Sequence, residues 1–215
     1  MAQQGAIRNT LALAVLGLLI EKPMHPYEMV NTLLDRNKDA SVKVSKGSLY
    51  DIVESLTKLG WIEAQTIERE GRRPERTVYS QTELGRQEFI RWLDELVRTP
   101  AKEYPKFLTA VGYLGALGRD GAIAALAERA ERLSTDAQES RRVLAEIHAS
   151  GVPRLFVIEM EYALQQTDAE LSWVKQLVSD IQDGNLGWPQ SHVVDGEQIW
   201  TTTDLGVAKQ ISQQK

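Results

Sequence analysis

The spacing of the apolar residues changes at Gly60, and this change restricts the fold more than any other feature of the chain. Before Gly60, apolar residues recur every three to four positions, as they do in amphipathic helices. After it, residues 61–80 mix β-forming and polar residues around the turn-like stretch EGRRP at 70–74. We therefore expect helices followed by a two-stranded hairpin.

Helical patterns begin well before the hairpin. The first, Ala6–Glu21, is apolar nearly all round, and its apolar run is too short to span a bilayer. The second, Pro26–Asn37, begins with a proline, which suits a first helical turn. We expect one face of this second helix in the core, with the residues Tyr27, Val30, Leu33 and Leu34.

A third helical segment reads SKGSLYDIVESLTKLG at 45–60, with Ser45 or Ser48 to cap its start and Gly60 to end it. Behind the hairpin, Thr82 is placed to cap a helix that continues to Pro100. This order of elements is that of a winged helix-turn-helix. In that fold the third helix enters the major groove of DNA, and the hairpin, or wing, touches the flanking backbone.

Charge is distributed unevenly along the chain. Residues 1–100 hold 14 basic and 14 acidic residues, whereas residues 101–215 hold 11 basic and 16 acidic, so the second half carries the whole net charge of −5. An acidic balance argues against broad nucleic-acid binding, but the first half is neutral.

The lack of cysteine excludes disulfides, thiolate nucleophiles and Cys-ligated zinc, and a reducing cytoplasm is the simplest compartment.

The N-terminal end of the third helix is the part that we expect to contact DNA. Asp51 and Glu54 on its exposed face would repel phosphates, so we expect the helix to point its first turn at the DNA. That turn offers free backbone N–H groups, the positive end of the helix dipole, hydroxyls and an ammonium group. The alternative is that the two serines only cap the helix. The predicted DNA contacts are Ser45, Lys46, Gly47, Ser48 and Tyr50.

Four arginines gather at the tip of the hairpin: Arg69, Arg72, Arg73 and Arg76. In a hairpin, their side chains can straddle a groove and neutralise phosphates. Neighbouring glutamates partly cancel their charge, so the alternative is a solvated loop of mixed charge. The helices upstream, in the order of a winged helix-turn-helix, favour the DNA-binding interpretation.

The chain resembles the PadR-like family of transcription regulators over about residues 8–98. The resemblance rests on LALAVLGLLIEKPMHPYEM at 11–29, SKGSLYDIVESLTKLGWIEA at 45–64 and GRRPERTVYSQTELGRQ at 71–87. Two departures are Pro26, where the family commonly has glycine, and SQ at 80–81, where a more apolar strand end is usual. The residues that stand where the family usually has them are Tyr50, Leu56, Gly60, Tyr79, Thr82 and Gly85.

The resemblance implies a mainly α fold with a two-stranded β wing, in which a DNA-binding winged helix-turn-helix (1–100) precedes a dimerisation domain of antiparallel helices (101–184). Residues 103–183 resemble the longer C-terminal version of the family, and the appendage 185–215 lies beyond the resemblance. The resemblance implies a dimeric and mostly repressing bacterial regulator that binds double-stranded DNA. A two-fold dimer implies a pseudo-palindromic operator with half-sites about one helical turn apart.

A heptad pattern gives an independent reason for dimerisation. Between residues 123 and 147, apolar and small residues recur with a 3.5-residue period. This period predicts a narrow seam for another helix, either within the chain or across a dimer. The dimerisation residues that we expect are Ile123, Leu126, Leu133, Leu144 and Ile147.

Trp92 has two candidate roles. Some relatives respond to small aromatic ligands, and Trp92 could stack such an effector against its dimer mate. Otherwise Trp92 packs in the interdomain core.

His25 is expected to cap a turn or helix. The histidines lack metal-ligand spacing, and no acidic pair, phosphate loop or nucleophile motif is present, so we expect no cofactor, no metal and no enzymatic activity.

These patterns and the resemblance predict a sequence-specific DNA-binding regulator that acts as a homodimer, with no membrane partner. Release by a small-molecule effector is implied by the resemblance alone. The alternative is a winged-helix protein-interaction module without specific DNA binding, whose acidic half binds a partner. Salt-sensitive binding to a palindromic duplex distinguishes the two.

Overall fold

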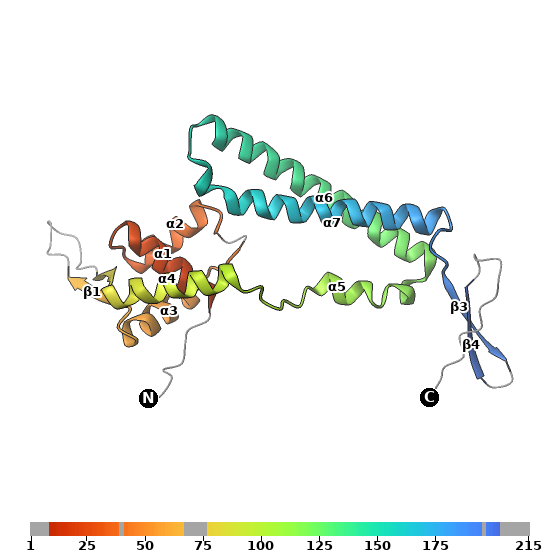
Figure 1. Cartoon of the computed structure of the whole chain (residues 1–215), viewed down its shortest axis with the longest axis horizontal. Coiled ribbons are helices and arrows are strands. Elements are labelled where there is room, and N and C mark those ends of the chain that lie inside the picture. The colour runs from red at the N-terminus through yellow and green to blue at the C-terminus, as the bar shows by residue number, and fades with distance from the viewer. Residues whose placement is uncertain (1–8, 39–40, 67–76, 195–196, 203–215) are drawn as a thin grey trace. The chain divides into compact units, whose positions relative to one another are not determined.

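The computed structural model describes residues 9–38, 41–66, 77–194 and 197–202 (Figure 1). The chain divides into two compact units, Met1–Glu103 and Tyr104–Lys215. The predicted fold class, mainly α with a two-stranded wing, is confirmed, and the second unit adds a further two-stranded sheet. No described helix combines the length and apolarity needed to cross a membrane.

The first two helices, α1 (Thr10–Glu21) and α2 (Pro26–Asp35), each begin at a side-chain cap. Asn9 accepts a hydrogen bond from the Leu11 N–H at 2.9 Å, and Nδ1 of His25 accepts one from the Tyr27 N–H at 3.1 Å. The expected cap role of His25 is therefore confirmed.

Both helices are shorter than the sequence predicts. The first begins at Thr10 and not at Ala6, because Asn9 has extended backbone angles and caps the helix. The second ends before Asn37, which adopts a left-handed φ of 52° that no right-handed helix can continue. Periodicity continues past both boundaries, and the local backbone decides where each helix ends.

The third helix, α3 (Lys46–Lys58), buries the apolar face that its spacing predicts and stops before Gly60, whose φ is +69°. Strands β1 (Ile62–Thr66) and β2 (Thr77–Gln81) then pair antiparallel, in a register that joins Ile62 to Gln81 and Thr66 to Thr77. Met24 extends this sheet on the other side of β2. It exchanges backbone hydrogen bonds of 3.1 and 2.9 Å with Tyr79, which ties the turn between α1 and α2 to the wing.

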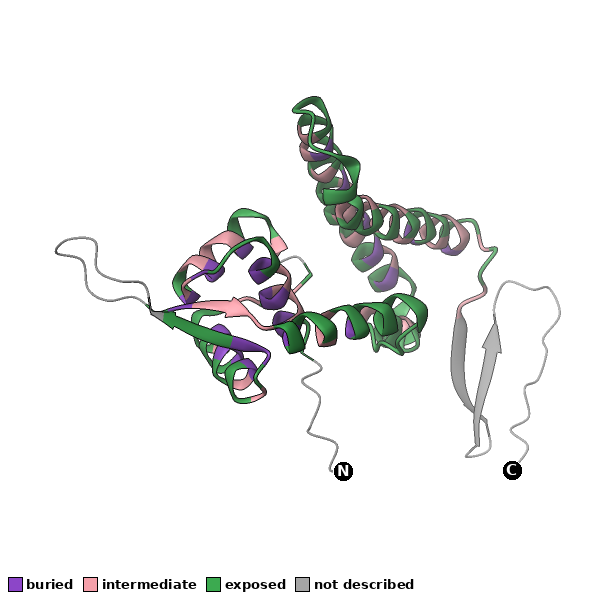
Figure 2. Ribbon diagram, turned by 60° about the vertical axis from the view of Figure 1, so that its left-hand side comes forward, coloured by how far each residue is buried: buried purple, intermediate pink, exposed green. Residues whose placement is uncertain are grey.

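The fourth helix, α4 (Glu83–Arg98), is capped by Thr82 as expected. Its buried face meets α1, where the ring of Phe89 lies against Gly17. The buried faces of α1, α2 and α3, together with Trp61, Ile62 and Trp92, form one hydrophobic core in the first unit (Figure 2). Burial of these side chains is the main force that holds the winged unit together.

The expected core face of α2 is partly wrong. Tyr27 and Leu34 are exposed over 51% and 43% of their surface, although Val30 and Leu33 are buried as predicted. The buried stripe consists of Pro26, Met29, Val30 and Leu33. It starts at the proline, so the side chains that follow Pro26 and Leu33 turn toward solvent.

The second unit consists of two long helices with short elements before and after them. Helices α6 (Gly118–Ala149) and α7 (Ile158–Gln182) lie side by side and antiparallel (Figure 1). Apolar residues at helical spacing predict a single helix from about Arg154 to Asp183, but Val157 has non-helical angles and separates a short 3-10 turn from α7. The remaining elements are α5 (Lys106–Val111), η2 (Leu114–Leu117), η3 (Arg154–Phe156), β3 (Pro189–Val194) and β4 (Glu197–Thr202).

The heptad pattern forms the seam between α6 and α7. Leu126 and Ala130 of α6 are buried against Val174 and Ile181 of α7. The intrachain alternative therefore accounts for the pattern in this part of α6.

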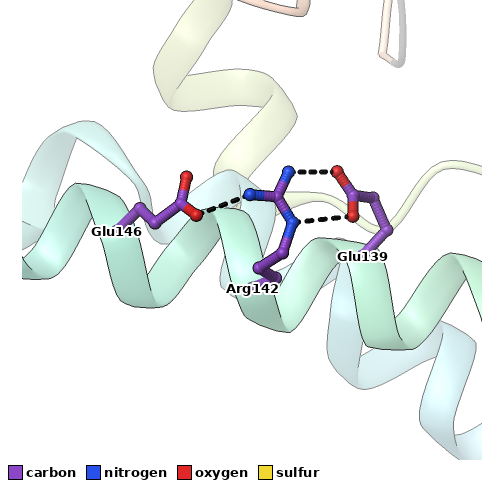
Figure 3. A network of polar contacts seen from close by, with 3 residues as sticks. All are labelled: Glu139, Arg142 and Glu146. Carbon is purple, nitrogen blue, oxygen red and sulfur yellow. Dashed lines mark hydrogen bonds and ion pairs between the residues drawn. The ribbon is translucent and has the colours of Figure 1, made fainter.

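The opposite face of α6 is charged. Arg142 lies between Glu139 and Glu146, with hydrogen bonds of 2.5 to 2.9 Å (Figure 3). The hydrogen bonds to Glu139, followed by the charges of both carboxylates, raise the pKa of Arg142 above its ordinary value. These pairs are spaced one helical turn apart, so they favour the helix itself.

Candidate nucleic-acid interface

The first turn of α3 is capped and open to solvent. Ser45 has extended backbone angles, and its Oγ accepts a hydrogen bond from the Ser48 N–H at 3.1 Å and donates one to Ser48 Oγ at 2.7 Å. Ser45 therefore caps the helix, and a contact of the two serines with DNA stays a prediction. The first intrahelical hydrogen bond runs from the Leu49 N–H to the Ser45 carbonyl, so the amides of Lys46 and Gly47 face outward at the positive end of the helix.

Gly47 is exposed, and the fold does not require it. A Cβ atom built at this position meets nothing within 4 Å, and its φ does not lie in the left-handed region that favours glycine. A glycine in a helix costs about 0.5–1 kcal/mol relative to alanine. The described structure therefore gives no packing or conformational reason for glycine here, and a DNA contact at Gly47 stays a prediction.

The exposed face of α3 carries acidic groups in its middle. Glu54 forms an ion pair with Lys58 at 2.5 Å, and the hydrogen bond from Lys58 lowers the pKa of Glu54 below its ordinary value. A depression of about 340 Å³ lies between this face and β2, with Tyr50, Asp51 and Tyr79 among its lining residues. A phosphate placed there would meet two carboxylates, so this geometry favours contact through the helix start.

Lys46 and Tyr50 flank the helix start. Tyr50 is exposed over 49% of its surface, which leaves its ring free to reach a partner. The Lys46 ammonium lies over the ring of Tyr27, with Nζ 5.5 Å from the ring centroid. The sequence pattern places Tyr27 in the core and does not predict its contact with Lys46. The one sequence feature that points to such a contact is an aromatic residue at the start of the preceding helix.

The described part of the wing consists of its two strands. Strands β1 and β2 are paired, and Gln65 Nε2 donates to Ser80 Oγ across them at 2.9 Å. The predicted DNA contacts Arg69, Arg72, Arg73 and Arg76 lie outside the described residues, and their role stays a prediction.

Trp92 lies in the core of the first unit, with 7% of its surface exposed. Its packing there requires no ligand, and the effector role stays a prediction.

The proposed dimerisation residues lie along α6. Leu126 and Leu144 are buried, and Ile123 and Leu133 pack against the seam with α7. Ile147 is half-buried near the end of the same helix. A dimerisation role for these five residues also stays a prediction.

Among the residues that the structure covers, no group of three or more His, Cys, Asp or Glu side chains is placed to hold a metal ion.

Comparison with known proteins identifies the first unit. A sequence match to the family described as "Transcriptional regulator PadR-like family" spans residues 15–91. No curated protein matches the chain.

Solved structures share the fold over most of the chain. Bacillus subtilis PadR in complex with operator DNA is 19% identical, with a TM-score of 0.69, over 80% of this chain and 99% of that one. The same protein in complex with p-coumaric acid is 18% identical, with a TM-score of 0.69, over 81% and 99%. The Vibrio cholerae virulence activator AphA is 16% identical, with a TM-score of 0.63, over 81% and 99%.

At these identities the structural likeness establishes a common fold. The sequence match covers α1 from Val15 onward, all of α2 and α3, the wing strands and the first half of α4, which include the elements that build the candidate interface. Residues 15–91 of this unit are similar to the PadR-like family of transcriptional regulators, and the solved structures share its fold.

Proposed function

We propose that the protein is a dimeric repressor that binds a pseudo-palindromic operator in double-stranded DNA, in the cytoplasm. The observation that carries this proposal is the first turn of α3, where exposed amides, two serine hydroxyls and an ammonium group meet on a winged unit. Groups of this kind hydrogen-bond to phosphate oxygens and base edges. The relative from Bacillus subtilis bound to operator DNA supports the same use of the fold.

Release by a small molecule is part of the proposal. It is supported by the Bacillus subtilis relative in complex with p-coumaric acid and by the resemblance of the chain to ligand-responsive regulators. The sign of regulation rests on the resemblance alone. Because AphA is described as an activator, a reporter gene placed behind the bound site is the measurement that fixes this sign.

DNA binding is tested with the full chain and a duplex that it selects from a random library. We expect a two-fold symmetric consensus and an affinity that falls linearly with salt on logarithmic axes. Replacing Arg72 and Arg73 by alanine should weaken binding on all sequences and flatten the salt slope by about two, since each lost phosphate contact removes about one.

A charge-matched control is available on α6. Arg132→Ala with Arg142→Ala removes the same charge from residues that pair with glutamates of their own helix. If the library yields no preferred duplex, and the wing and control variants behave alike, the protein-interaction alternative takes the place of this proposal.

A further inference from the structure

We infer that Tyr27 is a positioning residue for DNA recognition, which holds the Lys46 ammonium at the open end of α3. The inference rests on the proposed function, because the held ammonium is useful only to an anionic partner. Lys46 Nζ lies 5.5 Å from the centroid of the Tyr27 ring, within the roughly 6 Å over which a cation is attracted to an aromatic face.

The backbone that carries the Tyr27 ring is held at the start of α2. The Tyr27 N–H donates to Nδ1 of His25 at 3.1 Å, and the adjoining Pro26 is buried in the core. Met29 and Val30, in the following turn, are also buried and anchor the helix. Tyr27 therefore has a fixed backbone and a short side chain with a planar ring, whereas the lysine has a long flexible stem and is the member that becomes ordered.

Tyr27 does not serve the core. Half of its surface is exposed, while the inward face of α2 is formed by other side chains. Within the described part of the chain, no carboxylate forms an ion pair with Lys46, and the Tyr27 ring is the group that stabilises its charge. An ion pair would cancel the positive charge before DNA arrived, whereas an aromatic face orients the ammonium and leaves its charge available.

The arrangement extends the interface from one helix to two. The serine cap and the outward amides belong to α3, but the basic side chain of its first turn, Lys46, is oriented by a residue of α2. Because the Lys46 side chain is already ordered in the free protein, it loses less conformational entropy when DNA binds. Loss of the ring should therefore weaken binding without removing any group that touches DNA.

The test is a double-mutant cycle on the full chain, read as affinity for the duplex that the wild type selects from a random library. Tyr27→Phe keeps the ring and should bind within about two-fold of wild type. Tyr27→Leu removes the ring and should weaken binding about three-fold. Lys46→Met keeps the stem and removes the charge, and in that background Tyr27→Leu should have no further effect.

Two affinity results would overturn the inference. Equal losses in Tyr27→Phe and Tyr27→Leu would make the phenolic hydroxyl the group that matters. An undiminished effect of Tyr27→Leu in the Lys46→Met background would show that the two residues act independently.

A DNA-free measurement separates this inference from the proposed function and from any folding defect. The ε-methylene protons of Lys46 should show an upfield ring-current shift by NMR in the wild type and in Tyr27→Phe. A random-coil shift in the folded wild type would contradict the contact. If the shift is present and the library yields no preferred duplex, the proposed function fails and the positioning role fails with it, although the contact itself exists.

Discussion

A Cβ atom built on Gly85 would lie 1.9 Å from the carbonyl oxygen of Trp61. The first turn of α4 therefore rests directly on the backbone that enters the wing. Thr82 secures the same place, because its N–H donates to the Trp61 carbonyl at 3.0 Å and its Oγ1 donates to the Gly60 carbonyl at 2.7 Å. The end of α3, the start of the wing and the start of α4 are joined at this point.

Gly85→Ala should destabilise the first unit. The added methyl group meets backbone atoms that no side-chain rotation can move, and overpacking of this kind costs about 3 kcal/mol. Thermal unfolding of the full chain, followed by circular dichroism, measures the change. A melting temperature equal to that of wild type would show that α4 moves away from Trp61 at little cost.

Gly47→Ala should separate stability from DNA binding. The added methyl group has open space around it, so the helix should gain about 0.5–1 kcal/mol. If DNA approaches the backbone here, the same methyl group should weaken binding to the selected duplex by about 1.4 kcal/mol, which is roughly ten-fold. Unchanged affinity in a stabilised variant would remove Gly47 from the interface.

Gln81→Met should stabilise the first unit by about 1 kcal/mol. The side-chain Nε2 of Gln81 is buried and has no hydrogen-bond partner among the described atoms, and an unsatisfied buried donor is costly. Gln81 belongs to the polar pair at the end of β2, where the family usually has a more apolar strand end. Gln65→Met is the matched control in β1, because the Gln65 amide is exposed and already bonded to Ser80. A lower melting temperature for Gln81→Met than for wild type would refute this reading.

The contact between Glu21 and Arg36 should make stability depend on acidic pH. Arg36 donates two hydrogen bonds, of 2.5 and 2.8 Å, to the Glu21 carboxylate, and these lower the pKa of Glu21 below its ordinary 4.5. A lowered carboxylate pKa stabilises the fold above the unfolded value and stops doing so as pH falls through the folded value. Because both side chains are nearly half exposed, the gain is about 0.5 kcal/mol.

Glu21→Gln is the variant that isolates this effect. The variant should unfold more easily than wild type at neutral pH, and the difference should vanish once the pH lies well below 4.5. Urea titrations at several pH values measure it. A difference that is the same at all pH values would assign the contact to packing and not to charge.

The sequence alone predicts the winged unit well, because caps and periodicity are local. Ser45, Thr82 and Gly60 each act where the pattern places them. The exposure of Tyr27 could not be predicted from the spacing of apolar residues. A residue at the edge of an apolar face can lie in the core or in solvent, and the packing of α2 on α3 determines which. Its contact with Lys46 joins two helices across about twenty residues, and no spacing rule reports such a pair.

The heptad pattern shows a different limit. A 3.5-residue period identifies a seam but does not say which helix fills it, and α7 of the same chain fills part of it here. The break at Val157 was missed for a related reason. Valine fits the apolar pattern of a helix, while the turn that reverses the chain between α6 and α7 needs a non-helical residue there.

Footprinting of the full-length protein on the DNA upstream of its own coding region tests the central claim most directly. We expect protection of one two-fold symmetric site, with half-sites about one helical turn, or roughly 10 base pairs, apart. Protection should weaken as salt is raised and should disappear in Lys46→Met at protein concentrations that saturate the site with wild type. Uniform protection along the fragment, or none in the presence of competitor DNA, would contradict sequence-specific recognition by the first turn of α3.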